Sequence, residues 1–246
     1  MKKAILSVFD YSAVPQFSHL PSAERDLSLA FKIAKEILKI DDITVITDID
    51  VTSGYNIIKL DYPDKTAVVR ELKRIVKNTS KPTDVFVYFS CHGVKNALCF
   101  SNELFSSKEF FDIFFNNGLP IGSTMLVVFD TCHSGSMSDF HFRYDPFTRT
   151  MEKTKELPTG IYYPLSVSLS ASDDDRKAIS THKGSPFTYT LYRLLNELDC
   201  GITIEQLHDR LYEMLPTVAR IMNPTICSTS SRERAKIPFF HNLDNC

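Results

Sequence analysis

Two short segments of the sequence carry side chains that could do chemistry. They are Cys91-His92-Gly93 and Thr131-Cys132-His133-Ser134-Gly135. A cysteine is an effective nucleophile when a base or a cation holds it as a thiolate, and its attack on a carbonyl needs N–H donors that face the developing oxyanion. The two segments together predict nucleophilic catalysis, with Cys132 as the nucleophile and His92 as its base.

The neighbours of this pair fit the same chemistry. Gly93 would let the backbone approach a substrate carbonyl closely, and the backbone N–H groups of Gly93 and Cys132 are the expected oxyanion hole. Asp130 lies two residues before Cys132, so on a strand the two side chains share one face. A carboxylate in that place favours a substrate with a basic side chain.

Other interpretations of these residues are weaker. Cys91, His92, Cys132 and His133 imitate a zinc site, but adjacent strand residues point to opposite faces, so the four side chains converge poorly. A phosphatase loop would need an arginine where Ser138 stands, and the serine elbow G-x-S-x-G is absent.

Apolar runs of strand length alternate with helical patterns along the chain. Strands are expected at residues 4–9, 42–50, 84–90, 123–130, 165–172 and 225–230, and helices at 22–38, from Asp64, and at 106–118, 185–198 and 203–215. This order predicts a three-layer α/β fold, in which helices cover both faces of a mostly parallel central sheet. Catalytic groups of such sheets lie beyond the carboxyl ends of the strands, where both reactive segments fall.

Composition narrows the function classes. The chain has 246 residues and a net charge of −2, which excludes collagen-like, disordered and highly basic nucleic-acid-coating proteins. No apolar run reaches the roughly 18 residues of a membrane span, and the six cysteines show no disulfide-scaffold spacing. A cytoplasmic protein with neither nucleic-acid nor membrane partners is expected.

One segment loses all periodicity. Residues 138–160 are polar and contain prolines and several basic side chains, so an exposed linker loop is expected there. It would join a first part, residues 1–137, to a second part, residues 161–246, within one domain.

The motifs VYFSCHG (87–93) and VVFDTCHSGS (127–136) resemble those of the metacaspases, relatives of the caspases, which are typically YSGHG and D-x-C-H-S-G. Cys91 stands where the family usually has glycine. The resemblance implies the three-layer caspase-like (caspase-hemoglobinase) fold over residues 1–246. It also implies a cysteine endopeptidase with a Cys132–His92 dyad that cleaves after Arg or Lys.

The resemblance extends to other segments. LPSAERD (20–26) looks like L-x-G-C-x-N-D, which would place Asp26 beside Asp130 in the pocket for the basic side chain. SLSASDDDRKA (168–178) resembles a segment with substrate contacts, which implies Ser168 and Asp174. NPTICSTS (223–230) resembles the closing strand of the family.

Calcium is a further question that the resemblance raises. Many metacaspases bind it through several aspartates, and Asp139, seven residues after Cys132, matches one of these ligands. Residues 94–105 hold only Glu103 where an acidic run is expected, and one carboxylate binds a hard cation weakly. We therefore expect that no cofactor is required, and calcium bound at Asp139 is the alternative.

The sequence thus predicts a peptidase acting on proteins or peptides with basic residues, and a monomer rather than an obligate dimer. The alternative is a weak or inactive caspase-like pseudoenzyme that binds a protein partner. Self-cleavage is expected in the 138–160 loop, after Arg149, Lys153 or Lys155, where caspase relatives are cut. The alternative there is a flexible connector that is not cut.

Overall fold

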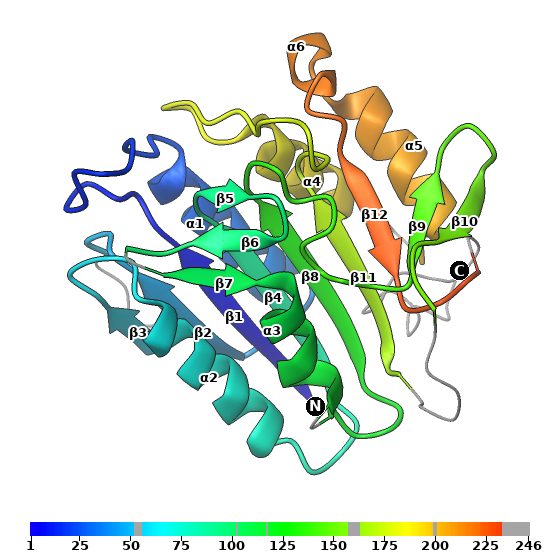
Figure 1. Ribbon diagram of the computed structural model, residues 1–246, viewed down its shortest axis with the longest axis horizontal. Coiled ribbons are helices and arrows are strands. Elements are labelled where there is room, and N and C mark those ends of the chain that lie inside the picture. The colour runs from blue at the N-terminus through cyan, green and yellow to red at the C-terminus, as the bar shows by residue number, and fades with distance from the viewer. Residues whose placement is uncertain (52–55, 102, 117, 157–162, 199–200, 233–246) are drawn as a thin grey trace.

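The central element of the protein is a large, mostly parallel sheet. The computed structural model describes residues 1–51, 56–101, 103–116, 118–156, 163–198 and 201–232. Within these residues, nine strands form one sheet in the order β10-β9-β12-β11-β8-β4-β1-β2-β3, and a small antiparallel sheet has the order β5-β6-β7. Figure 1 shows the large sheet running diagonally, with β4 and β8 near its centre.

The strands and helices have the following bounds. The strands are β1 (Lys2–Val8), β2 (Asp42–Thr47), β3 (Asn56–Lys59), β4 (Asp84–Ser90), β5 (Gly93–Val94), β6 (Ala97–Cys99), β7 (Leu104–Ser106), β8 (Thr124–Asp130), β9 (Phe142–Asp145), β10 (Thr150–Lys153), β11 (Leu165–Ser170) and β12 (Thr225–Ser228). The helices are α1 (Ala23–Lys32), α2 (Lys65–Lys77), α3 (Ser107–Phe111), α4 (Pro186–Asn196), α5 (Ile204–Met214) and α6 (Thr217–Arg220). Two π-helical turns, η1 (Ile33–Ile37) and η2 (Asp112–Asn116), continue α1 and α3.

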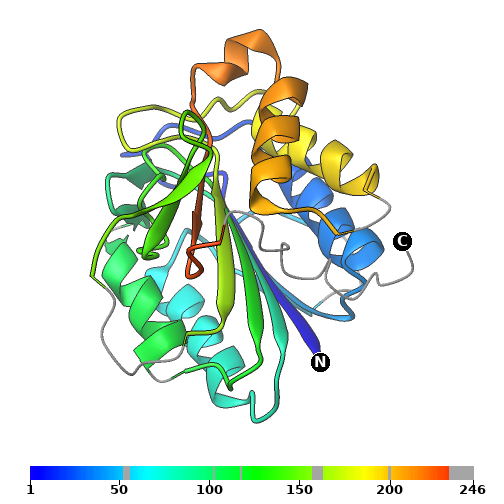
Figure 2. The same ribbon diagram turned by 90° about the vertical axis from the view of Figure 1, so that its right-hand side faces the viewer.

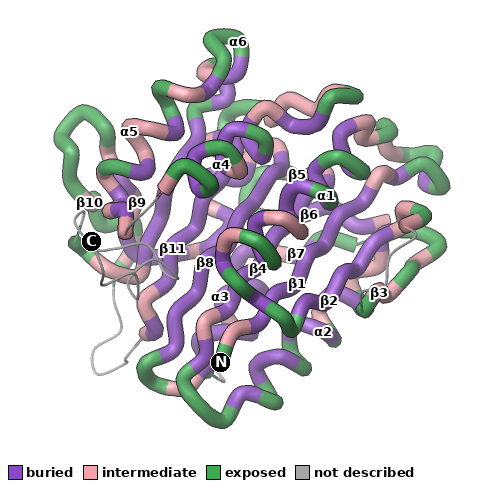
Figure 3. The backbone as a smooth tube through the Cα atoms, turned by 180° about the vertical axis from the view of Figure 1, so that it is seen from behind, coloured by how far each residue is buried: buried purple, intermediate pink, exposed green. Residues whose placement is uncertain are grey.

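Helices cover both faces of the sheet, as the sequence predicts. One apolar core lies under α1, α4 and α5, and a second lies under α2, α3 and η2. Figure 2 shows these two helical layers on opposite sides of the sheet. In β4, Phe86 and Tyr88 enter the first core, whereas Val85, Val87 and Phe89 enter the second. The central strands are therefore buried on both sides, as Figure 3 shows, which explains their unbroken apolar sequences.

Helix starts follow the local sequence. The Asp64 carboxylate accepts a hydrogen bond from the Thr66 amide at the start of α2, and Ser106 and Glu109 form a capping box on α3. Ser22 holds the N-cap position of α1, but its side chain makes no capping bond. Its hydroxyl instead accepts a bond from Ser180 Oγ at 2.8 Å.

The expected linker loop at 138–160 is wrong in its described part. Strands β9 and β10 form an antiparallel hairpin there, and β9 joins the sheet beside β12. Phe142 and Tyr144 alternate inward and are buried, while the Asp145 carboxylate accepts bonds from Phe147 N and Thr148 Oγ1 in the turn. Residues 157–160 lie outside the described chain.

Among the described residues, no helix has the length and apolar character that crossing a membrane requires.

Candidate active site

The two reactive segments lie opposite each other at the carboxyl edge of the sheet. Strands β4 and β8 are parallel neighbours, and Ser90 pairs with Asp130 at their ends. His92 and Cys132 each follow two residues beyond this pair, so both extend from the same edge at matching positions. The β4–β8 register therefore brings a segment with an imidazole and a segment with a thiol to the same edge of the sheet.

Cys132 differs from the other described cysteines in its exposure. Cys91, Cys99 and Cys227 are buried, whereas Cys132 is partly exposed. Its sulfur lies 3.9 Å from the Ala178 carbonyl oxygen, and burial raises the pKa of the thiol. The resting side chain is thus a thiol that needs a base before it can attack.

His92 is held on one side of its ring. Its Nε2 lies 2.7 Å from the Ser18 carbonyl oxygen, and its ring stacks on Phe17 with a centroid distance of 5.3 Å and contacts Tyr11 at 4.6 Å. A carbonyl can only accept, so Nε2 is the donor of this contact, and in the neutral ring Nδ1 carries the lone pair. The Ser18 contact therefore selects the tautomer in which Nδ1 can act as the base.

The segment before α1 supplies these supports, which the sequence did not indicate. Tyr11 accepts a hydrogen bond from the His92 amide at 3.2 Å and donates to the Cys99 carbonyl. Ser18 acts through a backbone oxygen, which every residue type has. The aromatic character of Tyr11 and Phe17 was the one available signal.

Serine hydroxyls hold the turn after Cys132. Ser134 Oγ donates to the Thr131 carbonyl at 2.9 Å, and Ser172 Oγ donates to the same oxygen at 3.1 Å. Ser170 Oγ donates to the Ser134 carbonyl at 2.9 Å. These hydroxyls come from β8, β11 and the segments that follow them, so the end of the sheet fixes the turn that carries the thiol.

The expected oxyanion donors lie in this turn and in β5. A Cβ on Gly93 would stand 2.4 Å from the Cys132 carbonyl oxygen, so only glycine fits at this close approach. The backbone of Gly93 therefore lies against the turn that carries Cys132.

Two buried carboxylates lie near the ends of β4 and β8. Asp26 of α1 is fully buried and Asp130 of β8 is nearly so. Asp26 Oδ1 accepts a bond from the Ser185 amide at 2.8 Å, and Asp26 Oδ2 accepts one from Ser90 Oγ at 3.4 Å. Burial and the charge of Asp130 raise the pKa of Asp26 to about 7, and burial raises that of Asp130 to about 6. This pair would gain most from a cation between its members.

Two further residues orient Asp130, and the sequence analysis missed both. Thr188 Oγ1 donates to Asp130 Oδ2 at 2.6 Å, and the Tyr88 hydroxyl lies 2.7 Å from Thr188 Oγ1. Both side chains are fully buried. Tyr88 could have been found from strand alternation, because it lies two residues before Ser90 and four before His92. Thr188 comes from α4, and nothing in the sequence marked it.

The two other expected substrate residues are used within the protein. Ser168 is buried in the interior of β11, and its hydroxyl donates to Ser138 Oγ at 2.9 Å. Asp174 Oδ1 accepts bonds from the Ser136 amide and hydroxyl at 2.8 and 2.9 Å. The structure does not bring Ser168 to the strand ends, and it gives Asp174 the role of a brace for the loop after Cys132.

Asp139, the expected calcium ligand, forms an ion pair with Lys155. Asp139 Oδ2 lies 2.7 Å from Lys155 Nζ. Within the described residues, no group of three or more His, Cys, Asp or Glu side chains could hold a metal ion. One carboxylate paired with an ammonium does not suit a hard divalent cation, which prefers several oxygen ligands. The residues present therefore do not fit calcium.

The three residues after which self-cleavage is expected all form ion pairs. Arg149 pairs with Glu205 at 2.7 Å and Asp209 at 2.8 Å on α5, and Lys153, at the end of β10, pairs with Glu156. Lys155 pairs with Asp139. These side chains lie on an ordered hairpin rather than on an open loop.

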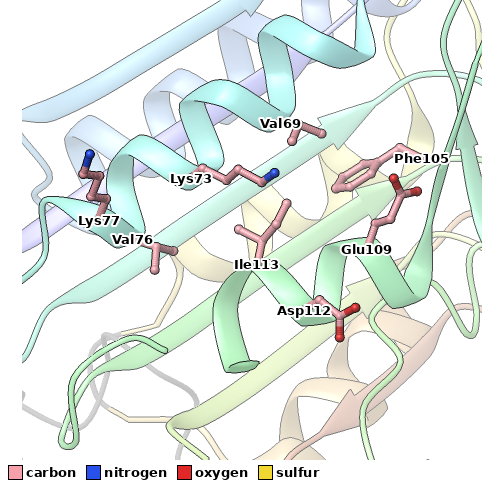
Figure 4. Close-up of a pocket in the computed structure, with 8 residues that line it drawn as sticks. All are labelled: Val69, Lys73, Val76, Lys77, Phe105, Glu109, Asp112 and Ile113. Carbon is pink, nitrogen blue, oxygen red and sulfur yellow. The ribbon is translucent and has the colours of Figure 1, made fainter. Parts of the chain in front are cut away.

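A cavity of about 480 Å³ between α2, α3 and η2 is shown in Figure 4. Its liners are Val69, Lys73, Val76, Lys77, Phe105, Glu109, Asp112 and Ile113. None of these residues belongs to the two reactive segments, residues 91–93 and 131–135. The cavity lies on a helical layer, it holds no nucleophile, and we assign it no part in the chemistry.

Comparisons with known proteins agree with this architecture. Residues 31–238 match the family model described as the caspase domain. No curated protein matches the sequence. The crystal structure of protein GSU0716 from Geobacter sulfurreducens is similar with a TM-score of 0.66 and 15% identity, over 97% of this chain and 98% of that one. At this identity, the likeness concerns the fold alone.

Proposed function

Because this chain belongs to the caspase-domain family of peptidases, we propose that it is a cysteine endopeptidase in which Cys132 is the nucleophile and His92 the base. The observation that carries the proposal is the β4–β8 register, which brings the two residues to the same edge of the sheet, near two buried carboxylates. The metacaspase-like motifs around both residues support the same roles.

The reaction follows from the groups present. His92 Nδ1 takes the proton of Cys132, and the thiolate attacks the scissile carbonyl carbon to form a C–S bond. The N–H groups of Gly93 and Cys132 bind the oxyanion. Its collapse breaks the C–N bond, and His92 gives its proton to the leaving amine. Water, deprotonated by His92, then hydrolyses the thioester and returns the free thiol.

The carboxylate pair supports cleavage after Arg or Lys. Asp26 and Asp130 lie near the ends of β4 and β8, and a buried cation would relieve the mutual repulsion of the two groups. Charge-assisted bonds from a guanidinium to two carboxylates are among the strongest side-chain contacts. Asp-ending substrates would meet only repulsion there.

The experiment compares wild type with Cys132→Ala on fluorogenic peptides whose cleaved residue is Arg, Lys or Asp. Turnover of the Arg and Lys peptides by wild type alone is expected. An irreversible Arg chloromethyl ketone should add one label, which mass spectrometry places on Cys132. Wild type that binds the Arg ketone reversibly but neither turns over peptide nor is labelled would support the alternative, a pseudoenzyme that binds a protein partner.

A further inference from the structure

The loop after Cys132 borders an unfilled space on one side. A cavity of about 210 Å³ lies between this loop, the β9–β10 hairpin and β12. Its lining includes Gly135, Ser136, Asp139, Arg143, Lys155 and Cys227. Met137 and Phe140 of the loop pack in the apolar core, but on the cavity side no packing fills the space, so polar contacts hold the loop there.

Two tethers hold the loop at different points. Ser136 is bound to Asp174 through its amide and hydroxyl. Asp139, the last tethered residue of the loop, is bound to Lys155, and its own amide donates to the Ser136 carbonyl at 3.1 Å. Asp139 has a left-handed φ of 55°, an uncommon conformation for a residue other than glycine. The ion pair thus holds the loop where its backbone is strained.

Lys155 is itself well placed to act as an anchor. Its ammonium lies 4.4 Å from the centre of the Phe111 ring, so a carboxylate and an aromatic face both contact it. The residue before it, Thr154, donates its amide to the His141 carbonyl and its hydroxyl to the Phe140 carbonyl, each at 2.8 Å. The anchor is therefore fixed to the end of the hairpin.

We propose that Lys155 is a built-in cation that positions the Cys132 loop through Asp139, so that the peptidase works without calcium. The inference rests on the proposed function. A divalent cation does not fit the single Asp139 carboxylate, because the Lys155 ammonium already pairs with it. Arg143 adds a second positive charge to the same cavity. Lys155 and Asp139 are positioning residues, since neither touches the reacting atoms.

The test compares Lys155→Met and Lys155→Arg with Lys35→Met, which removes the exposed ion pair with Asp41, outside the hairpin. Turnover of an Arg peptide and hydrogen exchange of residues 133–139 are measured with calcium chloride or with a chelator. We expect Lys155→Met to lower kcat by about tenfold with a smaller change in KM, because it misplaces the nucleophile. It should also speed exchange in the loop. Lys155→Arg should keep most of both properties, and Lys35→Met should match wild type.

A charge swap, Asp139→Lys with Lys155→Asp, should slow loop exchange again relative to Lys155→Met. Normal loop exchange and turnover in Lys155→Met would overturn the proposal, and so would loss of wild-type turnover in chelator. Hydrogen exchange does not depend on peptidase activity. Wild type that turns over no peptide would therefore count against the proposed function, while the exchange data would still decide the role of Lys155.

Discussion

Asp26 and Asp130 reach the same buried place from α1 and β8, and the charge of Asp130 raises the pKa of Asp26. The Ser185 amide donates to Asp26 at 2.8 Å, while Thr188 donates to Asp130 at 2.6 Å. Two like charges held together without a cation are costly, and the protein offsets this by hydrogen bonds from α4 and its N-cap. The arrangement suits an incoming guanidinium or ammonium.

The first prediction replaces each carboxylate by its isostere. Asp26→Asn and Asp130→Asn should each lower kcat/KM for Arg peptides by tenfold or more, because each removes a charge-assisted hydrogen bond of about 1.5 to 3 kcal/mol. The Tm at pH 7 should stay equal or rise, since a buried charge is lost. Steady-state kinetics and thermal melts measure the two effects.

Asp175→Asn is the matched control, because Asp175 is an exposed aspartate in the run after β11. It should leave kcat/KM unchanged. Equal cleavage of Asp-ending and Arg-ending peptides by wild type would contradict a basic-residue pocket.

The second prediction concerns pH. The pKa values of Asp26 and Asp130 rise to about 7 and about 6 in the folded protein, whereas an aspartate of the unfolded chain has a pKa near 4. Between these pH values the folded protein therefore holds protons that the unfolded chain has released. The resulting stability is complete below about pH 4 and is lost as pH rises toward 7. The Tm of wild type should therefore fall relative to Asp26→Asn/Asp130→Asn over this interval. A constant difference between the two melting curves would show that the carboxylates do not titrate there.

Substrate binding should show the opposite trend. A guanidinium needs charged carboxylates, so KM for Arg peptides should fall as pH rises through 6 and 7. Calorimetric titration of an Arg aldehyde in buffers of different ionisation enthalpy should detect proton release on binding near pH 6. Binding without proton exchange would show that the pair is already ionised in the free enzyme.

The third prediction concerns the residue that orients Asp130. Thr188→Val keeps the shape of the side chain but removes the donor to Asp130 Oδ2 and the partner of the Tyr88 hydroxyl. KM for Arg peptides should rise severalfold, while labelling of Cys132 by iodoacetamide should keep its rate. Thr188→Ser, which retains the hydroxyl, should restore KM. A slower labelling rate would instead place Thr188 among the supports of the dyad.

The fourth prediction distinguishes the thiols. Burial raises the pKa of Cys91 well above its usual value, and the side chain is 3% exposed. Cys91→Ala should therefore keep most activity, whereas Cys132→Ala should abolish it with little change in Tm. Mass spectrometry after brief alkylation should find the label on Cys132. Loss of activity in Cys91→Ala with an unchanged melt would reverse this assignment.

Much of the candidate site could be predicted from the sequence. The alternation of side chains along a strand and the order of the strands along the chain indicate which residues lie at the carboxyl edge of the sheet. The apolar runs at 84–90 and 123–130 predicted strands of one mostly parallel sheet, whose ends placed His92 and Cys132 at one edge. That β4 and β8 are direct neighbours came from the structure. Asp130 followed from its spacing to Cys132. Asp26 came only from the resemblance, since α1 is distant in the sequence.

The rest depended on contacts that local sequence does not record. The Ser18 carbonyl is a backbone group, and Lys155 meets Asp139 only because a hairpin returns the chain to it. That hairpin was missed because charged residues on its exposed face concealed the inward alternation of Phe142 and Tyr144. Ser168 stays a prediction of the resemblance, and the structure buries its hydroxyl inside β11.

The last prediction concerns self-cleavage, and the structure ranks its candidates. Arg149 is held by Glu205 and Asp209 of α5, and Lys155 by Asp139 and Phe111. Among the described residues, Lys153 has one ion-pair partner, Glu156, whose side chain is 91% exposed. A side chain must leave its partners to enter the pocket of another copy, so Lys153 is the least restrained. Any first cut in purified wild type should therefore follow Lys153, and Glu205→Ala/Asp209→Ala should add a cut after Arg149.

The measurement is a time course of wild type, the double variant and Cys132→Ala, with N-terminal sequencing of the fragments. Leu207→Ala, at a buried core position of α5, is a useful comparison because it loosens the helix without freeing Arg149 directly. If it produced the same cut after Arg149, local unfolding rather than release of the ion pairs would be the cause. Fragments that also form in Cys132→Ala would indicate a contaminating protease. Active wild type that stays whole would show that the hairpin is a permanent part of the sheet and that activity needs no cut.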